Sequence, residues 1–392
     1  MMILENKRPS LSHEEVFAAA AQLVDKYVSM WVEVCNIESQ TIDKEGVDRV
    51  GAFFIEHAKG LGYQIDIHYE QKAGNALTLT MNPDAKGAPV CISGHMDTVF
   101  PRGLFGYPPT RIEGDMIYGP GVVDCKGGLI VGSLAMEALL RCGYNERPIK
   151  MIFQSDEEVD SRLSEKRTVA YMAKMAEGCT AFINLESTTA GYHIIERKGI
   201  RRYEIDVFGK AAHSSTPHKG ANAIAEAAHK IQKITEWQPP EGVTANIGII
   251  QGGNAANTVA EHCQFVVDIR YVEPSQVDTI ESFLKTVVDS SRIEGTRASI
   301  RLRSARVAMP RTKRNEELLD RLNEAYTRAG LSTVLPQKGT GGSDASDMTS
   351  YGIPVVDNVG AEGTRSHSVD EYARISSLLE NAKRIIAAVI YL

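Results

Sequence analysis

Short apolar runs of β-type residues alternate with segments of helical periodicity along the first half of the chain, and this alternation constrains the fold most strongly. Strands that are separated by helices assemble into parallel sheets whose faces the helices cover. The sequence therefore predicts an α/β layer around a central, mostly parallel sheet. The expected strands are residues 76–81, 90–93, 149–154 and 181–185, and the expected helices are residues 16–34, 47–61 and 128–141.

The pattern changes near residue 200. Residues 201–208 (RRYEIDVF) alternate polar and apolar side chains, as a half-exposed antiparallel strand does. The elements that follow give the order βαββαβ, which is typical of a ferredoxin-like α+β domain. The other expected elements are strands at 243–250, 264–271 and 298–303 and helices at 222–235 and 275–290.

Helical segments return at 315–329 and 376–390. We therefore predict one discontinuous α/β domain, residues 1–198 and 311–392, interrupted by an α+β domain of residues 199–310. At the start of the first helix, Ser12 and Glu15 have the spacing of a capping box.

Composition excludes several classes of protein. Hydrophobic residues make up 43% and charged residues 24% of the 392 positions, which excludes a disordered or collagen-like chain. A net charge of -7 argues against a nucleic-acid partner, and no apolar run approaches the ~20 residues of a membrane span. Residues 1–20 lack the apolar core of an export signal, and the six cysteines form no CxxC motif. We expect a cytoplasmic protein with reduced thiols and no membrane association.

Five short motifs at or near predicted strand ends supply carboxylates or imidazoles. Ligand groups in an α/β sheet collect at the carboxyl ends of the strands, so motifs that are distant in the sequence can converge there. Each motif alone is weak, because an HxD triplet, a pair of glutamates or a glycine-rich turn is usually an ordinary surface loop. The motifs contain His95 and Asp97, Asp124, Glu157 and Glu158, Glu186, and His367.

Together, two histidines and at least three carboxylates suit a pair of divalent ions, for which zinc is the preferred metal. A pair of metal ions needs a bridging ligand, and a shared carboxylate can provide it. A second acid beside a ligand acid, as in Glu157–Glu158, can serve as general base toward a metal-activated water. His95 and Asp97 point to the same side of an extended segment, where the carboxylate can orient the ring.

The motifs GHMDTVFP, GPGVVDCKGG, SDEEVDS and SHSVDEY resemble those of the M20 family of co-catalytic zinc metallopeptidases and amidohydrolases. The resemblance extends from about residue 25 to the C-terminus. Within this family the motifs are most similar to those of the glutamate-carboxypeptidase-like branch, which is related to acetylornithine deacetylase and succinyl-diaminopimelate desuccinylase. It implies a zinc-peptidase-type catalytic domain interrupted by a ferredoxin-like lid and dimerisation domain.

The resemblance also implies a role for each motif residue. It implies that Asp97 orients His95, that Glu157 is the general base, and that a cis peptide bond joins Asp124 to Cys125. The implied metal ligands are His95, Asp124 and Glu186 for one ion and Asp124, Glu158 and His367 for the other.

Four further residues match family positions near the substrate. His213 corresponds to a histidine that reaches the active site of a neighbouring subunit and stabilises the oxyanion. Asn257 and Arg270 correspond to residues that hold the substrate, and an arginine suits a carboxylate because its planar fork binds in two places. Gly342 lies in a loop that lines the substrate pocket with backbone groups. Residues 197–199 are expected to form the hinge between the domains.

We therefore expect two Zn²⁺ ions per subunit, with Co²⁺ or Mn²⁺ as possible substitutes, in a homodimer that pairs through its lid domain. The expected reaction is hydrolysis of an amide or peptide bond next to a free carboxylate, of the carboxypeptidase or dipeptidase type, by a di-zinc-activated water. An N-acyl-amino-acid deacylase is the alternative, because its substrates also carry a free carboxylate beside the cleaved amide. A non-catalytic binding relative is the remote alternative.

Overall fold

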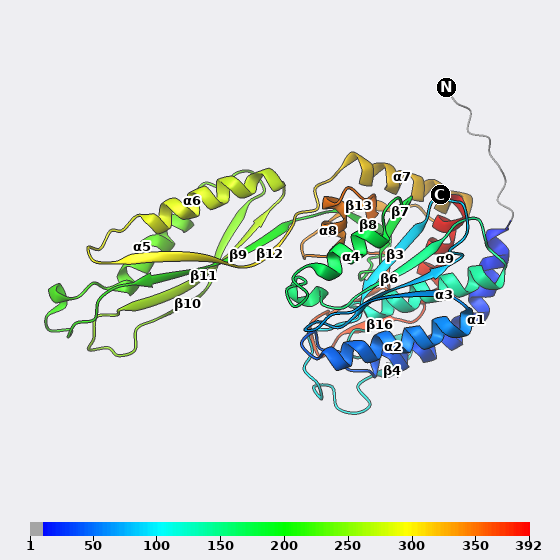
Figure 1. Cartoon of the computed structure of the whole chain (residues 1–392), viewed down its shortest axis with the longest axis horizontal. Coiled ribbons are helices and arrows are strands. Elements are labelled where there is room, and N and C mark those ends of the chain that lie inside the picture. Colours follow the sequence, from blue (N-terminus) through cyan, green and yellow to red (C-terminus); the bar gives the residue numbers. More distant parts are fainter. Residues whose placement is uncertain (1–10) are drawn as a thin grey trace, which may run out of the picture. The chain divides into compact units, whose positions relative to one another are not determined.

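The computed structural model describes residues 11–392, so part of the segment in which we expected no export signal lies outside the described residues. The chain divides into two compact units. Unit 1 comprises the residues up to Ile195 together with Arg311–Lys338 and Ser343–Leu392, and unit 2 comprises Glu196–Pro310 and Gly339–Gly342. Figure 1 labels their elements.

A six-stranded sheet forms the centre of unit 1, in the order β1-β2-β6-β3-β7-β14. Neighbouring strands β6, β3, β7 and β14 are parallel, whereas β2 runs antiparallel to both β1 and β6. The predicted mostly parallel sheet is therefore confirmed. Its strands are β1 (Gln64–His68), β2 (Ala76–Met81), β3 (Val90–His95), β6 (Ile149–Gln154), β7 (Ala181–Asn184) and β14 (Val355–Val356).

Helices cover this sheet because its central strands carry apolar side chains on both faces. On β3, Val90 and Ile92 enter the main hydrophobic core, in which α1 (His13–Cys35), α3 (Lys126–Arg141) and α9 (Ser377–Tyr391) pack together. The other helices of unit 1 are α2 (Lys44–Leu61), which contacts β1 and β2; α4 (Arg167–Met175), which contacts β6 and α8 (Asp344–Ser350); and α7 (Lys313–Arg328), which contacts α9.

A small antiparallel sheet joins two distant parts of unit 1, in the order β15-β16-β5-β4. Its strands are β4 (Arg111–Glu113), β5 (Met116–Tyr118), β15 (Gly363–Thr364) and β16 (Tyr372–Arg374). The loop between β15 and β16 contains His367, and the segment after β5 leads to Asp124. Pairing of β5 with β16 therefore holds these two segments next to each other. A two-stranded sheet of β8 (Tyr192–Arg197) and β13 (Leu335–Gly339) completes the set.

Unit 2 has the predicted βαββαβ order, with a four-stranded antiparallel sheet in the order β10-β11-β9-β12. The apolar face of this sheet packs against α5 and α6 in a separate hydrophobic core. The ferredoxin-like prediction is therefore confirmed. The elements are β9 (Gly199–Phe208), α5 (Ala223–Thr235), β10 (Thr244–Gly252), β11 (His262–Tyr271), α6 (Val277–Asp289) and β12 (Arg297–Arg306).

Several local predictions differ from the structure. The capping box is wrong, because the Ser12 hydroxyl pairs with Glu14 rather than with the backbone of the first turn. The predicted limits of the inserted domain, 199 and 310, also differ from those of unit 2, which begins at Glu196 and gains Gly339–Gly342. The reason is that the backbone of Arg197 pairs with Met309, which lies in unit 2, and that Gly342 packs against Arg306. All six cysteines are unpaired thiols, and none of the described helices combines the length and apolarity needed to cross a bilayer.

Candidate metal centre

Three adjacent strands deliver most of the predicted ligands to one edge of the central sheet. His95 is the last residue of β3, the Glu157–Glu158 pair follows β6, and Glu186 follows β7. Because β6 and β7 both pair with β3 in parallel, their carboxyl ends lie side by side. The strand order thus brings together residues that lie in separate motifs of the sequence.

Asp124 lies between two groups of these side chains. One of its carboxylate oxygens, Oδ1, is 3.0 Å from His95 Nε2, and this histidine nitrogen is 3.7 Å from Glu186 Oε1. The other oxygen, Oδ2, is 3.4 Å from His367 Nε2, which is 3.0 Å from Glu158 Oε2. Each oxygen of Asp124 therefore faces one imidazole and one further carboxylate, which is the arrangement expected of a bridging ligand.

Asp97 contacts both a predicted metal ligand and the turn of the two glutamates. His95 Nδ1 is 2.9 Å from the carbonyl oxygen of Asp97 and 3.3 Å from its carboxylate, so the ring is held with Nε2 toward Asp124. The same carboxylate accepts hydrogen bonds from the backbone N–H groups of Glu157 and Glu158, at 3.2 and 3.1 Å, and from the Thr41 hydroxyl. One buried aspartate thus positions both the imidazole and the turn that carries the two glutamates.

The loop that carries Asp124 is held by a residue that sequence reasoning missed. The buried Glu371 accepts hydrogen bonds at its Oε1 from the backbone N–H groups of Val123 and Asp124, at 3.0 and 3.1 Å. Glycine is needed just beyond, because a Cβ on Gly128 would lie 2.0 Å from the carbonyl oxygen of Leu185. The predicted cis peptide bond between Asp124 and Cys125 is confirmed. His367 has a left-handed backbone with φ of 65°, a strained conformation for a non-glycine residue.

The protonation behaviour of the cluster shows that it favours positive charge. Burial raises the pKa of Glu186 well above its usual value, and burial together with the charges of Asp124 and Glu157 raises the pKa of Glu158 to about 7. Hydrogen bonds to Asp124 and Glu158 raise the pKa of His367 to about 11. The buried carboxylates therefore repel one another and have too few positive groups around them. Bound divalent cations would relieve this repulsion.

The donor set fits such cations. Ligand atoms of His95, Asp124 and Glu158 lie within 4.8 Å of one another. His95, Cys125 and Glu186 also meet this limit, but the Cys125 thiol donates to the carbonyl oxygen of Leu185 at 3.1 Å, and burial raises its pKa well above the usual value. A cysteine binds a metal ion only as a thiolate, and Cys125 favours the neutral thiol. The carboxylate of Asp124 is therefore the better third donor.

His213 and Asn257 lie together within unit 2. The two loops that carry them are joined by a bridge between His213 and Thr258 and by a hydrogen bond from Ser214 N–H to the Asn257 carbonyl oxygen at 2.9 Å. The exposed His213 accepts a hydrogen bond at Nδ1 from the Ser215 backbone N–H at 3.2 Å. In the neutral ring the proton therefore lies on Nε2, which can donate it outward.

Arg270 and Gly342 also lie together within unit 2, but at the other end of its sheet. Arg270 is next to the last residue of β11, whereas the loop of Asn257 precedes the first. Sequence reasoning selected Arg270 alone; the structure adds Arg197 and the buried Arg306 around the same glycine loop. Arg270 contacts the Thr340 carbonyl at 3.5 Å, Arg197 donates to the Gly341 carbonyl at 3.1 Å, and Arg306 packs where a Cβ on Gly342 would lie. The feature that distinguishes Arg306 is that it is buried at the end of a strand, and this burial can be seen only in the structure.

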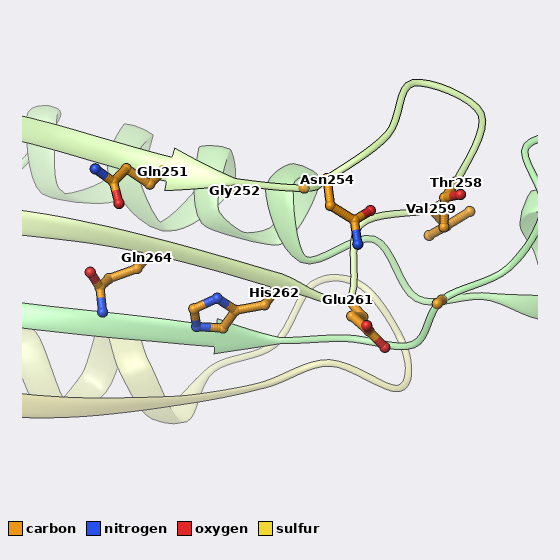
Figure 2. Close-up of a pocket in the computed structure, with 10 residues that line it drawn as sticks. Gln251, Gly252, Asn254, Thr258, Val259, Glu261, His262 and Gln264 are labelled. Carbon is orange, nitrogen blue, oxygen red and sulfur yellow. The ribbon is translucent and has the colours of Figure 1, made fainter.

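A separate pocket of about 330 Å³ in unit 2 contains none of the predicted metal ligands (Figure 2). It is lined by Gln251 and Gly252 of β10, by His262 and Gln264 of β11, and by loop residues such as Asn254. His262 Nε2 and Gln264 Nε2 both contact the Asp206 carboxylate, at 2.9 and 3.0 Å, so each side chain already has one polar partner within unit 2. We assign this pocket no part of the chemistry.

Comparison with known proteins gives a consistent result. Residues 91–391 match the family described as "Peptidase family M20/M25/M40". The chain is 27% identical over 372 residues to carboxypeptidase G2 of Pseudomonas sp. (strain RS-16), which covers 93% of this chain and 88% of that protein. It is 28% identical over 309 residues to succinyl-diaminopimelate desuccinylase of Roseobacter denitrificans, covering 74% and 79% of the two chains. A tripeptidase structure from Staphylococcus aureus shares the fold, with a TM-score of 0.77, 22% identity and coverage of 93% and 97%.

Proposed function

The chain belongs to peptidase family M20/M25/M40 and is a hydrolase of peptide or amide bonds, and from this premise we propose its substrate class and mechanism. We propose that it removes a C-terminal residue from a small peptide, or cleaves a dipeptide, at an amide bond next to a free carboxylate. The proposed catalyst is a water molecule activated at a pair of divalent ions, with zinc preferred and Co²⁺ or Mn²⁺ as substitutes.

The placement of Asp124 between two imidazoles carries this proposal. Its two oxygens face His95 and His367 at 3.0 and 3.4 Å, which matches a carboxylate shared by two ions. Glu186 would complete the first ligand group and Glu158 the second. When bound, the ions would lower the pKa of water and polarise the carbonyl of the substrate.

The remaining residues act on protons and position. Glu157, which is only 8% exposed, takes a proton from the attacking water and later passes it to the leaving nitrogen. Asp97 keeps the His95 ring and the Glu157 turn in register through the contacts described above. His213 of the partner subunit donates its Nε2–H to the developing oxyanion in a homodimer that pairs through unit 2.

The substrate carboxylate is bound by Arg270. Its side chain already pairs with a carboxylate, Asp268, at 2.7 Å, and Arg197 and Arg306 add positive charge around the Gly342 loop. Planar guanidinium groups suit a carboxylate better than an ammonium does. We propose that the backbone of Gly342 contacts the rest of the substrate, and that Asn257, like His213, acts from the partner subunit.

Deacylation of an N-acyl amino acid is the second candidate function. It is favoured by the similarity to succinyl-diaminopimelate desuccinylase and would use the same groups, because its substrate also carries a carboxylate beside the amide that is cleaved. A binding protein without catalysis would have lost the base or a ligand, yet both ligand groups and Glu157 are present.

A substrate panel with metal control tests the proposal. Purified full-length protein is loaded with Zn²⁺, Co²⁺ or Mn²⁺ and incubated with peptides that end in glutamate, with dipeptides and with N-acetyl and N-succinyl amino acids. We expect hydrolysis of a substrate that has a free C-terminal carboxylate, loss of this activity with chelator and its return on adding metal.

The same substrates with an amidated C-terminus are the matched control. We expect them to be hydrolysed at least ~100-fold more slowly, because Arg270 then has no carboxylate to bind. Equal rates for the free and amidated forms would refute the carboxylate-binding role. Preference for the N-acyl substrates would select the second candidate, and inactivity of every metal-loaded form would refute both.

A further inference from the structure

Two cysteines of unit 1 contact each other at a place remote from the metal ligands. Cys91 is the second residue of β3, and Cys179 lies in the turn between α4 and β7. The parallel pairing of β3 with β7 aligns Val90 with Ala181, and Thr180 N–H donates to the Pro89 carbonyl oxygen at 2.8 Å. This backbone pairing brings the turn against β3, so that the side chains of Cys91 and Cys179 interact.

The two cysteines differ in their exposure to solvent. Cys91 is 0% exposed, whereas Cys179 is 9% exposed and lines a pocket of about 550 Å³. The pocket lies between the end of α4 and the turn that contains Tyr351 and Ile353. A small oxidant that enters the pocket therefore meets Cys179 before the buried Cys91.

The charges around the pair make Cys179 the reactive member. Lys150 of β6 pairs with Cys91 in the sheet register, and its ammonium donates to the Met175 carbonyl oxygen at 2.7 Å, at the end of α4. The hydrogen bond from Cys91 and the charge of Lys150 lower the pKa of Cys179, and the same hydrogen bond raises the pKa of Cys91. A thiol with a lowered pKa that is accessible and backed by a second thiol is typical of a redox-sensitive cysteine.

The other cysteines lack this combination. Burial raises the pKa of the thiols of Cys35, Cys125, Cys142 and Cys263. Of these four only Cys142 is partly exposed, which makes it the matched control for a reactive surface thiol.

We propose that Cys179 and Cys91 are an oxidation site that closes to an intramolecular disulfide when the protein meets a peroxide. In the first step the Cys179 thiolate attacks one peroxide oxygen, the O–O bond breaks and the departing hydroxide takes a proton to leave as water. In the second step Cys91 loses its proton and its sulfur attacks the Cys179 sulfenic acid. The S–O bond breaks, a second water leaves, and the sulfur pair has given two electrons to the peroxide.

The experiment uses the reduced full-length protein. Limiting hydrogen peroxide is added, remaining thiols are alkylated, and the intact mass and peptide map are measured. We expect a species lighter by two hydrogen atoms, with one crosslink between the peptides of Cys91 and Cys179, that dithiothreitol reverses. Conversion of Cys179 to sulfinic acid while Cys91 remains alkylatable would overturn the proposal, as would faster oxidation of Cys142.

Two variants sharpen the result. In Cys91→Ala the partner thiol is missing, so we expect Cys179 to accumulate sulfinic acid and no loss of two hydrogens. In Cys142→Ser we expect the crosslink to form at the wild-type rate. A crosslink that survives in Cys91→Ala would identify a different partner and overturn the proposal. If Cys91→Ala does not fold, the peptide map of the wild-type protein decides alone.

Discussion

Asp97 shows why one residue can matter without touching substrate. Its carboxylate accepts two backbone N–H groups from the Glu157–Glu158 turn and a hydroxyl from Thr41, while its carbonyl holds His95. The side chain is fully buried, so each of these bonds acts in a medium of low dielectric constant. The position of the proposed general base is therefore linked to the orientation of a proposed metal ligand through one aspartate.

Glu157 is predicted to act on protons without binding metal. In Glu157→Gln we expect turnover to fall by at least ~100-fold, because the amide cannot accept the proton of water. Bound metal, measured by plasma mass spectrometry, should stay near the wild-type content. His367→Ala is the contrasting variant, in which we expect the metal content to fall. Full activity in Glu157→Gln would show that another group is the base.

His193 is predicted to make the protein less stable in acid. Burial lowers its pKa from 6.5 to about 4, aided by the positive charge of Arg384, so the folded state resists a proton that the unfolded chain accepts. Below pH 6.5 the unfolded state binds the extra proton, and stability falls until about pH 4 is reached. At roughly 1.4 kcal/mol for each pH unit, this one residue costs about 3 kcal/mol.

The measurement is urea unfolding at pH 7 and near pH 4.5 for the wild type, for His193→Phe and for His218→Gln. We expect the phenylalanine variant to lose less stability on acidification, whatever its stability at pH 7. His218 is exposed, so its replacement should leave the pH dependence as it is. An identical loss in wild type and His193→Phe would contradict the assignment.

At the scale of elements, α5 fixes the end of α6 in unit 2. Lys230 is 1% exposed, and its ammonium donates to the carbonyl oxygens of Val287, Val288 and Ser290 at the end of α6. Those carbonyls have no partner within the helix, and a cation there also opposes the negative end of the helix dipole. Glu226, one turn earlier on α5, lies 3.1 Å from the same ammonium.

Lys230→Met is therefore expected to lower the stability of unit 2 by about 3 kcal/mol or more, because it leaves Glu226 buried without its cation. The two tryptophans lie in different units, Trp31 in unit 1 and Trp237 against Phe283 in unit 2. In a Trp31→Phe background, the fluorescence of Trp237 during urea unfolding reports on unit 2.

Lys233→Met on the exposed side of α5 is the matched control and should change stability by less than about 0.5 kcal/mol. A similarly small effect of Lys230→Met would show that the buried ion pair contributes no net stability.

The sequence predicts elements well where periodicity is strong. The strand that ends at His95 and the strand that precedes Glu157 are almost entirely buried and consist mostly of apolar residues, so their location and the convergence of their ends could be predicted. Strands β14 and β15 have two residues each, too few for any period, and exist through pairing with distant partners. Glu371 precedes β16 and Arg306 ends β12, so both residues are positioned by pairing between strands that are distant in the sequence.

At the scale of the whole molecule, the proposed substrate-binding residues of unit 2 divide into two groups. Arg270 is followed by the last residue of β11, and the His213–Asn257 group lies before its first residue. The ten residues of β11 span roughly 30 Å at ~3.3 Å each. One small substrate therefore cannot touch both groups of the same chain, and this separation supports the proposal that His213 acts in the partner subunit.

Subunit mixing tests this arrangement. Chains with Glu157→Gln lack the base, and chains with His213→Ala lack the oxyanion donor, so each homodimer should be nearly inactive. In a mixed dimer, one site combines Glu157 of one chain with His213 of the other. Random reassociation of equal amounts should therefore restore roughly a quarter of the wild-type sites, measured as kcat per subunit.

The control mixes His213→Ala chains with chains that carry both substitutions, where no His213 is present and no recovery is expected. If His213 acted within its own chain, the first mixture would also stay inactive, because no single chain has both residues. Native mass spectrometry must show that mixed dimers formed, so that inactivity cannot be due to chains that failed to mix. If activity returns in the first mixture but not in the control, His213 must act in the active site of the other subunit. There the Nε2–H of this exposed ring would donate to the oxyanion.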